Sequence, residues 1–283
     1  MELRQRLLYP FAKKFFAGLK LEDAISRARF VDSRGMGAII DFLGEDVRTP
    51  EAADQAKAEY LRVLKEVGKA RLDASFTIKL TNLGLGFSYG ITRDNAFELA
   101  KTAKEEGVFL WVDMEGSSHT SDTIRIYREI HGVNRECGIA LQACLRRTRE
   151  DLGPLISDGA VIRLVKGAYK EPPATAFQKS SEVRVNWLTL VQESFNKSGR
   201  FAVGTHDRSL VGRALKLSEG YAGRIEFQML MGVRDSLKEE LLGKGKRVVE
   251  YIPYGTDWYG YGIGRLLEKK RNVLYFAQGL FGR

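Results

Sequence analysis

RLVKGAY, residues 163–169, ends an apolar strand with a guanidinium, an ammonium and a phenol within seven residues. Cations at the end of a buried strand are costly unless an anionic or electron-rich group lies against them. Arg163 and Lys166 therefore predict a strand that delivers charged side chains to the floor of a functional site.

The same arrangement recurs along the chain. Six further apolar runs end in a polar side chain or are followed directly by one. These side chains are Lys79, Asp113, Gln142, His206, Gln228 and Tyr251. Seven strands are thus expected to carry polar groups at their carboxyl ends.

Eight apolar runs of strand length alternate with segments of helical length. Strands are expected near residues 37–42, 75–81, 108–114, 138–143, 160–166, 201–205, 223–228 and 247–252. Helices are expected over residues 50–69, 93–106, 120–136, 180–197, 209–219, 234–242 and 258–271. Eight such units are typical of a distorted (β/α)8 TIM-like barrel, whose active site lies at the carboxyl ends of the strands. An open doubly wound sheet usually has fewer strands and a phosphate loop after the first, and no such loop follows Phe42.

The length and composition predict one barrel domain over residues 37–283, preceded by an N-terminal helical segment over residues 1–36. Within that segment Phe11, Phe15 and Leu19 could form an apolar stripe, next to Lys13 and Lys14. Either the stripe packs on the barrel, or the segment makes a basic amphipathic contact with a membrane surface. No secretion signal and no run of spanning length is expected.

Composition narrows the function classes. The 45 Lys and Arg against 36 Asp and Glu leave a formal charge of +9, but the cations are scattered, which disfavours a nucleic-acid partner. Cys137 and Cys144 bracket one strand, so we expect no disulfide and a reduced, cytoplasmic setting. No metal is expected, because His119, His131 and His206 lack ligand spacing.

A series of short motifs in this order resembles the proline dehydrogenase family, and the resemblance runs from about residue 37 to residue 272. The motifs are DFLGE (41–45), IKLTNLG (78–84), VDME (112–115), LQA (141–143), RLVKGAY (163–169), THD (205–207), EFQML (226–230) and YIPYG (251–255). Each is weak alone, and together they are specific.

The resemblance implies FAD held across the barrel mouth without a Rossmann segment. Arg163 would lie beside the flavin, Gln142 would bond its pyrimidine end, and other residues would hold the rest of the cofactor. The full set of expected cofactor residues is Gln142, Arg163, Val165, Lys166, Gly167, Ala168, Thr205, His206, Gln228 and Leu230. The last helix would lie over the barrel mouth.

The resemblance also implies a small cyclic amino acid as substrate, oxidised to 1-pyrroline-5-carboxylate. Lys79 and Arg265 would clamp its carboxylate, and Asp113 would orient Tyr251 or Lys79. Ala168, Tyr169, Leu230, Tyr251 and Tyr261 would line the ring, and Glu268 would hold Arg265 by an i,i+3 ion pair. The expected catalytic residues are Lys79, Asp113, Tyr251 and Arg265. Electrons would pass to a quinone, with a possible peripheral contact at the inner face of the membrane.

One position departs from the family pattern, because Gly264 stands where the first arginine of a Tyr-x-x-Arg-Arg-x-x-Glu motif is usual. A charged hydrogen bond is worth roughly 1.5–3 kcal/mol, so its loss predicts weaker carboxylate binding. Two interpretations follow: weak acceptance of proline, or a substrate whose carboxylate is absent, masked or differently placed.

Two other classes fit parts of the pattern. Lys79 or Lys166 could form a Schiff base in an aldolase-like barrel. A flavin-free nucleic-acid-binding barrel would explain the net charge. Neither accounts for Gln142, Arg163 and Tyr251 occurring in this order.

Overall fold

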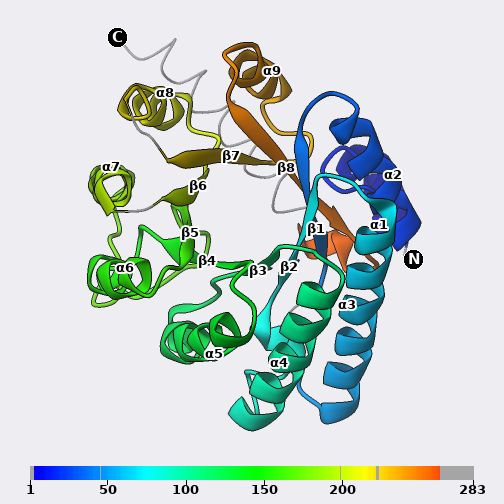
Figure 1. Ribbon diagram of the computed structural model, residues 1–283. Coiled ribbons are helices and arrows are strands. Elements are labelled where there is room, and N and C mark those ends of the chain that lie inside the picture. The colour runs from blue at the N-terminus through cyan, green and yellow to red at the C-terminus, as the bar shows by residue number, and fades with distance from the viewer. Residues whose placement is uncertain (1–2, 45, 198, 221–222, 262–283) are drawn as a thin grey trace.

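The computed structural model describes residues 3–44, 46–197, 199–220 and 223–261. Within these ranges eight parallel strands form a closed barrel in chain order, with helices around it (Figure 1). The strands are β1 (Gly37–Phe42), β2 (Ala74–Ile78), β3 (Leu110–Val112), β4 (Cys137–Gln142), β5 (Val161–Val165), β6 (Arg200–Gly204), β7 (Arg224–Leu230) and β8 (Arg247–Tyr254). The expected barrel is confirmed.

One helix follows each of the first seven strands. They are α3 (Pro50–Ala70), α4 (Tyr89–Glu105), α5 (Thr120–Val133), α6 (Thr148–Ser157), α7 (Ser180–Lys197), α8 (Arg208–Leu217) and α9 (Asp235–Gly243). The sequence analysis predicts no helix at α6, whose ten residues include Gly153 and Pro154, the two residue types with the lowest helix propensity. Residues 258–261 begin a further helical turn, and the rest of the expected last helix lies outside the described residues.

The start of α3 shows how local sequence sets an element. Thr49 caps it by accepting a hydrogen bond from the Ala52 amide at 3.3 Å, and Pro50 occupies the first turn, where its missing N–H costs nothing. Tyr60, Val63 and Leu64 then recur on one face and are buried against the barrel.

Two helices precede the barrel, α1 (Leu3–Ala12) and α2 (Leu21–Asp32). Helix α2 packs against β1 and β8, so it covers the barrel wall where the first and last strands meet. Its buried residues Leu21, Ala24, Ala28 and Val31 belong to the main core.

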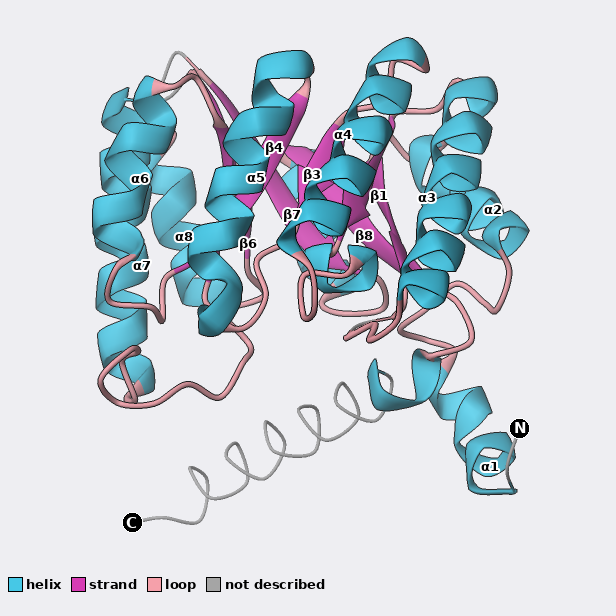
Figure 2. Cartoon of the chain, turned by 90° about the horizontal axis from the view of Figure 1, so that it is seen from below, coloured by secondary structure: helices cyan, strands magenta, loops and turns pink. Residues whose placement is uncertain are grey.

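Helix α1 instead lies at one end of the barrel, set apart from the ring of helices (Figure 2). The expected stripe of Phe11, Phe15 and Leu19 is wrong in part. Helix α1 ends at Ala12, and Phe11 is 65% exposed whereas Phe15 and Phe16 are buried. In the described part of the chain no helix combines the length and apolarity needed to cross a bilayer.

Strand boundaries also differ from expectation. Strand β2 ends at Ile78, and Leu80–Leu83 form the 3-10 helix η1. The sequence predicts a strand that continues to residue 81. Strands β7 and β8 run on to Leu230 and Tyr254. Gln228 and Tyr251 therefore lie within strands rather than after them.

Candidate active site at the carboxyl ends of the strands

Side chains of β1, β2, β3 and β8 converge inside the carboxyl end of the barrel. Alternate residues of a strand face the same side, so Asp41 shares the inner face with Ile39, and Tyr251 with Val249. Lys79 and Asp113 follow directly after β2 and β3. This geometry brings together groups that are up to 210 residues apart in the chain.

Lys79 lies between two carboxylates. Its ammonium pairs closely with Asp41, and its Nζ is 3.9 Å from Oδ2 of Asp113. Its backbone amide donates to the hydroxyl of Tyr60 on α3 at 3.3 Å. Because Lys79 and Asp41 are both buried, each charge needs the other.

Arg163 is the second buried cation of this network and pairs closely with Asp113. Its guanidinium carbon also lies 4.9 Å from the ring centroid of Trp111 and 5.8 Å from that of Tyr251. Burial lowers the pKa of Arg163 from its usual value. Arg163 lies in the middle of β5, so it reaches Asp113 by its length and not by a strand-end position.

Tyr251 donates a hydrogen bond from its hydroxyl to Oδ2 of Asp113 at 2.8 Å. Burial raises the pKa of Tyr251 well above 10.0, and the negative charge of Asp41 adds to the shift. The hydroxyl therefore stays protonated and acts as a donor. Asp113 thus contacts Arg163, Lys79 and Tyr251 at once.

A second layer of hydrogen bonds supports the rim of the barrel, which is formed by the carboxyl ends of the strands. Gln142 donates from Nε2 to the backbone carbonyl of Glu115 at 2.7 Å. The buried carboxylate of Glu115 accepts from the amide of Thr81 at 3.0 Å and also from its hydroxyl. The amide nitrogen of Gln142 is therefore engaged within the protein, which leaves Oε1 to accept from a ligand.

On the opposite side of the barrel, the loop after β6 contributes Thr205, His206 and Asp207. Nε2 of His206 accepts from the amide of Leu230 at 2.8 Å, so the ring proton of neutral His206 resides on Nδ1. Asp207 pairs closely with Arg184 of α7, and Lys166 Nζ lies 3.8 Å from its Oδ2. Two cations thus share one carboxylate, which leaves surplus positive charge there.

The remaining expected residues are placed less centrally. Gly167, Ala168 and Tyr169 are exposed on the loop after β5, while Thr205 and Gln228 are buried and Val165 and Leu230 are partly so. Tyr261 packs near the barrel end. Gly264, Arg265 and Glu268 lie outside the described residues.

Three residues near the candidate site are given no role by the sequence analysis: Asp41 and Glu115, which stand in the motifs DFLGE and VDME, and Arg184, which stands in none. Asp41 stands at an inward position of an otherwise apolar strand, a signal that strand periodicity could have revealed. Glu115 and Arg184 lie in a loop and a helix, where a charge usually indicates a solvated face. Only their contacts mark them.

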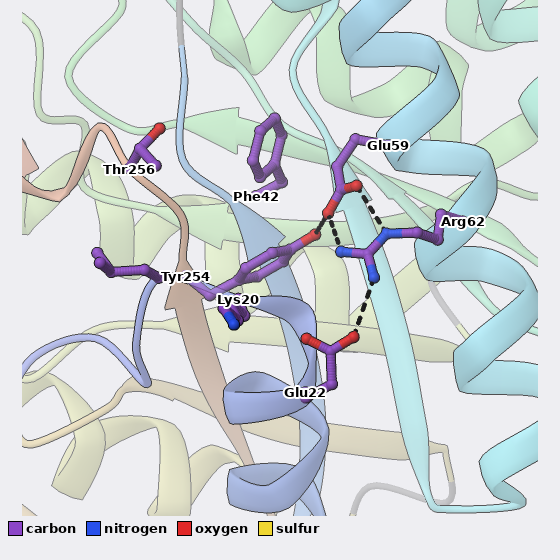
Figure 3. A pocket seen from close by; sticks show the side chains of 8 residues that line it. Lys20, Glu22, Phe42, Glu59, Arg62, Tyr254 and Thr256 are labelled. Atoms are coloured by element: carbon purple, nitrogen blue, oxygen red, sulfur yellow. Dashed lines mark hydrogen bonds and ion pairs between the residues drawn. The ribbon is translucent and has the colours of Figure 1, made fainter.

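A surface pocket of about 590 Å³ lies elsewhere, between α2, α3 and the ends of β1 and β8 (Figure 3). Arg62 reaches Glu59 at 2.8 Å and Glu22 at 3.2 Å, and the hydroxyl of Tyr254 donates to Glu59 at 2.6 Å. These groups satisfy one another. The candidate functional site is therefore the barrel mouth, where buried charges converge.

The fold and site define a class: a parallel (β/α)8 barrel enzyme with a buried, charge-balanced network at the carboxyl ends of its strands. The proline dehydrogenase family model matches residues 24–275. The chain belongs to the proline dehydrogenase family, a family of oxidoreductases.

Individual relatives agree with this assignment. Proline dehydrogenase 1 of Bacillus subtilis subsp. natto is 32% identical over 272 residues, covering 95% of this chain and 90% of the relative. Proline dehydrogenase of Deinococcus radiodurans is 30% identical, covering 99% and 93%.

A solved structure shares the fold. The crystal structure of proline utilization A (PutA) from Bdellovibrio bacteriovorus inactivated by N-propargylglycine superposes with a TM-score of 0.86 at 22% identity. The match covers 94% of this chain, which spans about a third of the length of that one (33%).

Proposed function

We propose that this chain oxidises L-proline to 1-pyrroline-5-carboxylate with FAD as cofactor and passes the electrons to a quinone. The names of the relatives support the substrate. The observation that carries the site is the convergence of Lys79, Asp113 and Tyr251 in one buried network.

The residues present fit a flavin dinucleotide. Lys166 and Arg184 leave net positive charge around Asp207, which suits an anionic diphosphate. Oε1 of Gln142 offers an acceptor for a ring N–H. Gln142, Arg163, Lys166, Thr205 and His206 would hold the cofactor, with Val165, Gly167, Ala168, Gln228 and Leu230 beside them. When bound, FAD supplies the hydride acceptor.

On the substrate side, Lys79 supplies a fixed positive charge for the carboxylate of proline. Asp41 keeps that ammonium charged in a buried setting, and the substrate carboxylate would share it. Arg265, held by Glu268, would supply the second arm of the clamp. Ala168, Tyr169, Leu230, Tyr251 and Tyr261 would line the ring.

Asp113 holds the hydroxyl of Tyr251 and does not need to act as a base. If the amine of proline arrives neutral, the reaction needs positioning more than proton abstraction. The buried network favours this, because it fixes side chains at the barrel mouth before the substrate binds.

The Schiff-base alternative is disfavoured by the same contacts. A lysine nucleophile must lose its proton, whereas Asp41 and Asp113 stabilise the charged form of Lys79. The alternative that the substrate is a proline analogue remains, because Gly264 stands where the family pattern has an arginine.

The test is anaerobic bleaching of the visible flavin absorbance of the purified protein. Proline, hydroxyproline, N-methylproline and prolinamide are compared. We expect bleaching by proline. A flavin-loaded protein bleached by prolinamide and not by proline would replace proline with a carboxylate-masked substrate, and a protein that binds no flavin would refute the proposal.

A matched pair of variants tests the site. Tyr251→Phe removes the hydroxyl that Asp113 holds, and we expect the KM for proline to rise roughly three- to tenfold, the loss of about one hydrogen bond. Tyr89→Phe removes a hydroxyl on the outer surface of α4 and should leave KM unchanged. An equal change of KM in the two variants would argue against a substrate site beside Tyr251.

The quinone acceptor suggests a peripheral membrane contact by a protein otherwise located in the cytoplasm. The exposed Phe11, close to Lys13 and Lys14, is the best candidate for this contact. We expect Phe11→Ser to weaken partitioning onto anionic vesicles. Unchanged partitioning would remove α1 from the proposed contact.

A further inference from the structure

An aromatic cluster links the N-terminal segment to the turn after β8. The ring of Phe16 stacks on that of Trp258 with centroids 5.4 Å apart and an interplanar angle of 7°. Tyr9 packs edge-on against both, at 5.1 Å from Trp258 and 5.6 Å from Phe16. Phe16 is 0% exposed and Trp258 is 1% exposed.

The backbone is tied at the same place. The amide of Ala17 donates to the carbonyl of Pro253 at 2.8 Å, and the amide of Gly255 donates to the carbonyl of Gly18 at 3.0 Å. A Cβ at Gly232, in the loop after β7, would clash with the carbonyl oxygen of Lys14. The N-terminal segment is therefore closely fitted against the loops after both β7 and β8.

This cluster reaches the barrel mouth through one residue. Tyr261 packs against the cluster that contains Phe16, Leu43 and Trp258. Tyr261 is also close enough to Tyr251 to contribute, after burial and Asp41, to the raised pKa of Tyr251. Tyr261 thus connects the Phe16–Trp258 stack, against which it packs, with the electrostatic surroundings of Tyr251.

We propose that Phe16 and Trp258 are positioning residues, which hold the turn after β8 so that Tyr261 closes the substrate side of the barrel mouth. The inference rests on the proposed function, because it takes Tyr261 as a wall of the proline site. It gives the N-terminal segment a role in substrate affinity as well as in stability.

Phe16→Leu and Trp258→Phe test this without emptying the cluster, and Phe16→Ala is the stronger variant if it folds. Phe30→Leu is the matched control for Phe16→Leu, because it makes the same substitution at an exposed position of the same N-terminal segment. KM and kcat for proline are measured with a water-soluble acceptor, well below each variant's Tm and at equal flavin content.

We expect the Phe16 and Trp258 variants to raise KM roughly three- to tenfold with a smaller change in kcat, since an aromatic contact of this kind restrains Tyr261 only in part. Phe30→Leu should match the wild type. A lower Tm with unchanged KM would show a purely structural role and overturn the inference. Failure of proline to reduce the wild-type flavin would overturn the proposed function, and this inference with it.

Discussion

At the scale of single residues, the site depends on pairs of buried charges. Lys79 with Asp41 and Arg163 with Asp113 balance two cations against two carboxylates in one network. Removing one member of a buried pair leaves an uncompensated charge and costs about 3–5 kcal/mol, whereas removing both members costs much less.

Asp41→Asn should therefore lower the free energy of unfolding by about 3 kcal/mol or more, because the buried ammonium of Lys79 loses the carboxylate that pairs closely with it, and the carboxylate of Asp113 lies farther away, at 3.9 Å. The double variant Asp41→Asn/Lys79→Met should recover part of that loss. Urea unfolding of the wild type, both single variants and the double variant gives the coupling. Additive effects would show that the two residues do not interact energetically.

Gly264 yields a second prediction at this scale, made from sequence since the residue lies outside the described ranges. Gly264→Arg should lower the apparent dissociation constant for proline by roughly one to two orders of magnitude if the missing arginine is what limits carboxylate binding. The measurement is flavin bleaching as a function of proline concentration. No gain in a folded, flavin-loaded variant would favour a substrate with a masked carboxylate.

At the scale of elements, a buried ion pair joins α9 and α2 to the outer face of β8. Glu250, 1% exposed, accepts from Lys238 Nζ at 2.5 Å and from Arg27 Nε at 2.7 Å. Lys238 is itself 2% exposed. This cluster braces the strand that carries Tyr251.

Glu250→Gln should lower the free energy of unfolding by about 3 kcal/mol, because it replaces the buried carboxylate between Lys238 and Arg27 with a neutral amide. The exposed carboxylate of Asp235, 3.0 Å from Lys238 Nζ, compensates only in part. Glu239→Gln is the control. Its partner Arg34 is exposed, and such surface pairs contribute about 0–1 kcal/mol. Chemical unfolding measures both, and equal losses would contradict a buried-charge effect.

Element by element, most of the barrel could be predicted, and the misses have physical causes. Helix α6 was not predicted because Gly153 and Pro154 have low helix propensity, although Thr148, Leu152 and Leu155 recur on its buried face. The expected helical stripe failed at Phe11 because α1 ends at Ala12, after which the chain turns and buries Phe16 instead. Apolar spacing does not report where a helix stops.

At the scale of the whole molecule, several buried acids share one direction of pKa shift. Burial raises the pKa of Cys137 from 9.0 to about 12, that of Cys144 from 9.0 to about 11, and that of Tyr60 from 10.0 to about 12. Each group is neutral when protonated, so the folded state retains protons that the unfolded state releases above its ordinary pKa.

This difference in bound protons gives the direction in which stability changes with pH. Stability from these groups is fully present below pH 9 and is lost as the pH rises from 9 toward 12, at about 1.4 kcal/mol per unit for each titrating group. We expect urea midpoints to fall steeply between pH 9 and 11. In the double variant Cys137→Ala/Cys144→Ala the urea midpoint should begin to fall nearer pH 10, because Tyr60 then remains. A urea midpoint that does not change with pH would contradict the raised pKa values.

The strand and helix alternation, the family and most of the rim residues can be read from the chain alone, because strand periodicity and strand-end polar groups are local features. Lys79, Asp113, Gln142 and Tyr251 are candidate site residues predicted in this way. The residues that contact them could not be predicted from local sequence features. The contacts of Asp41, Glu115 and Arg184 and the Phe16–Trp258 stack form only when barrel closure brings distant segments together, since burial and charge balance are properties of the packed molecule.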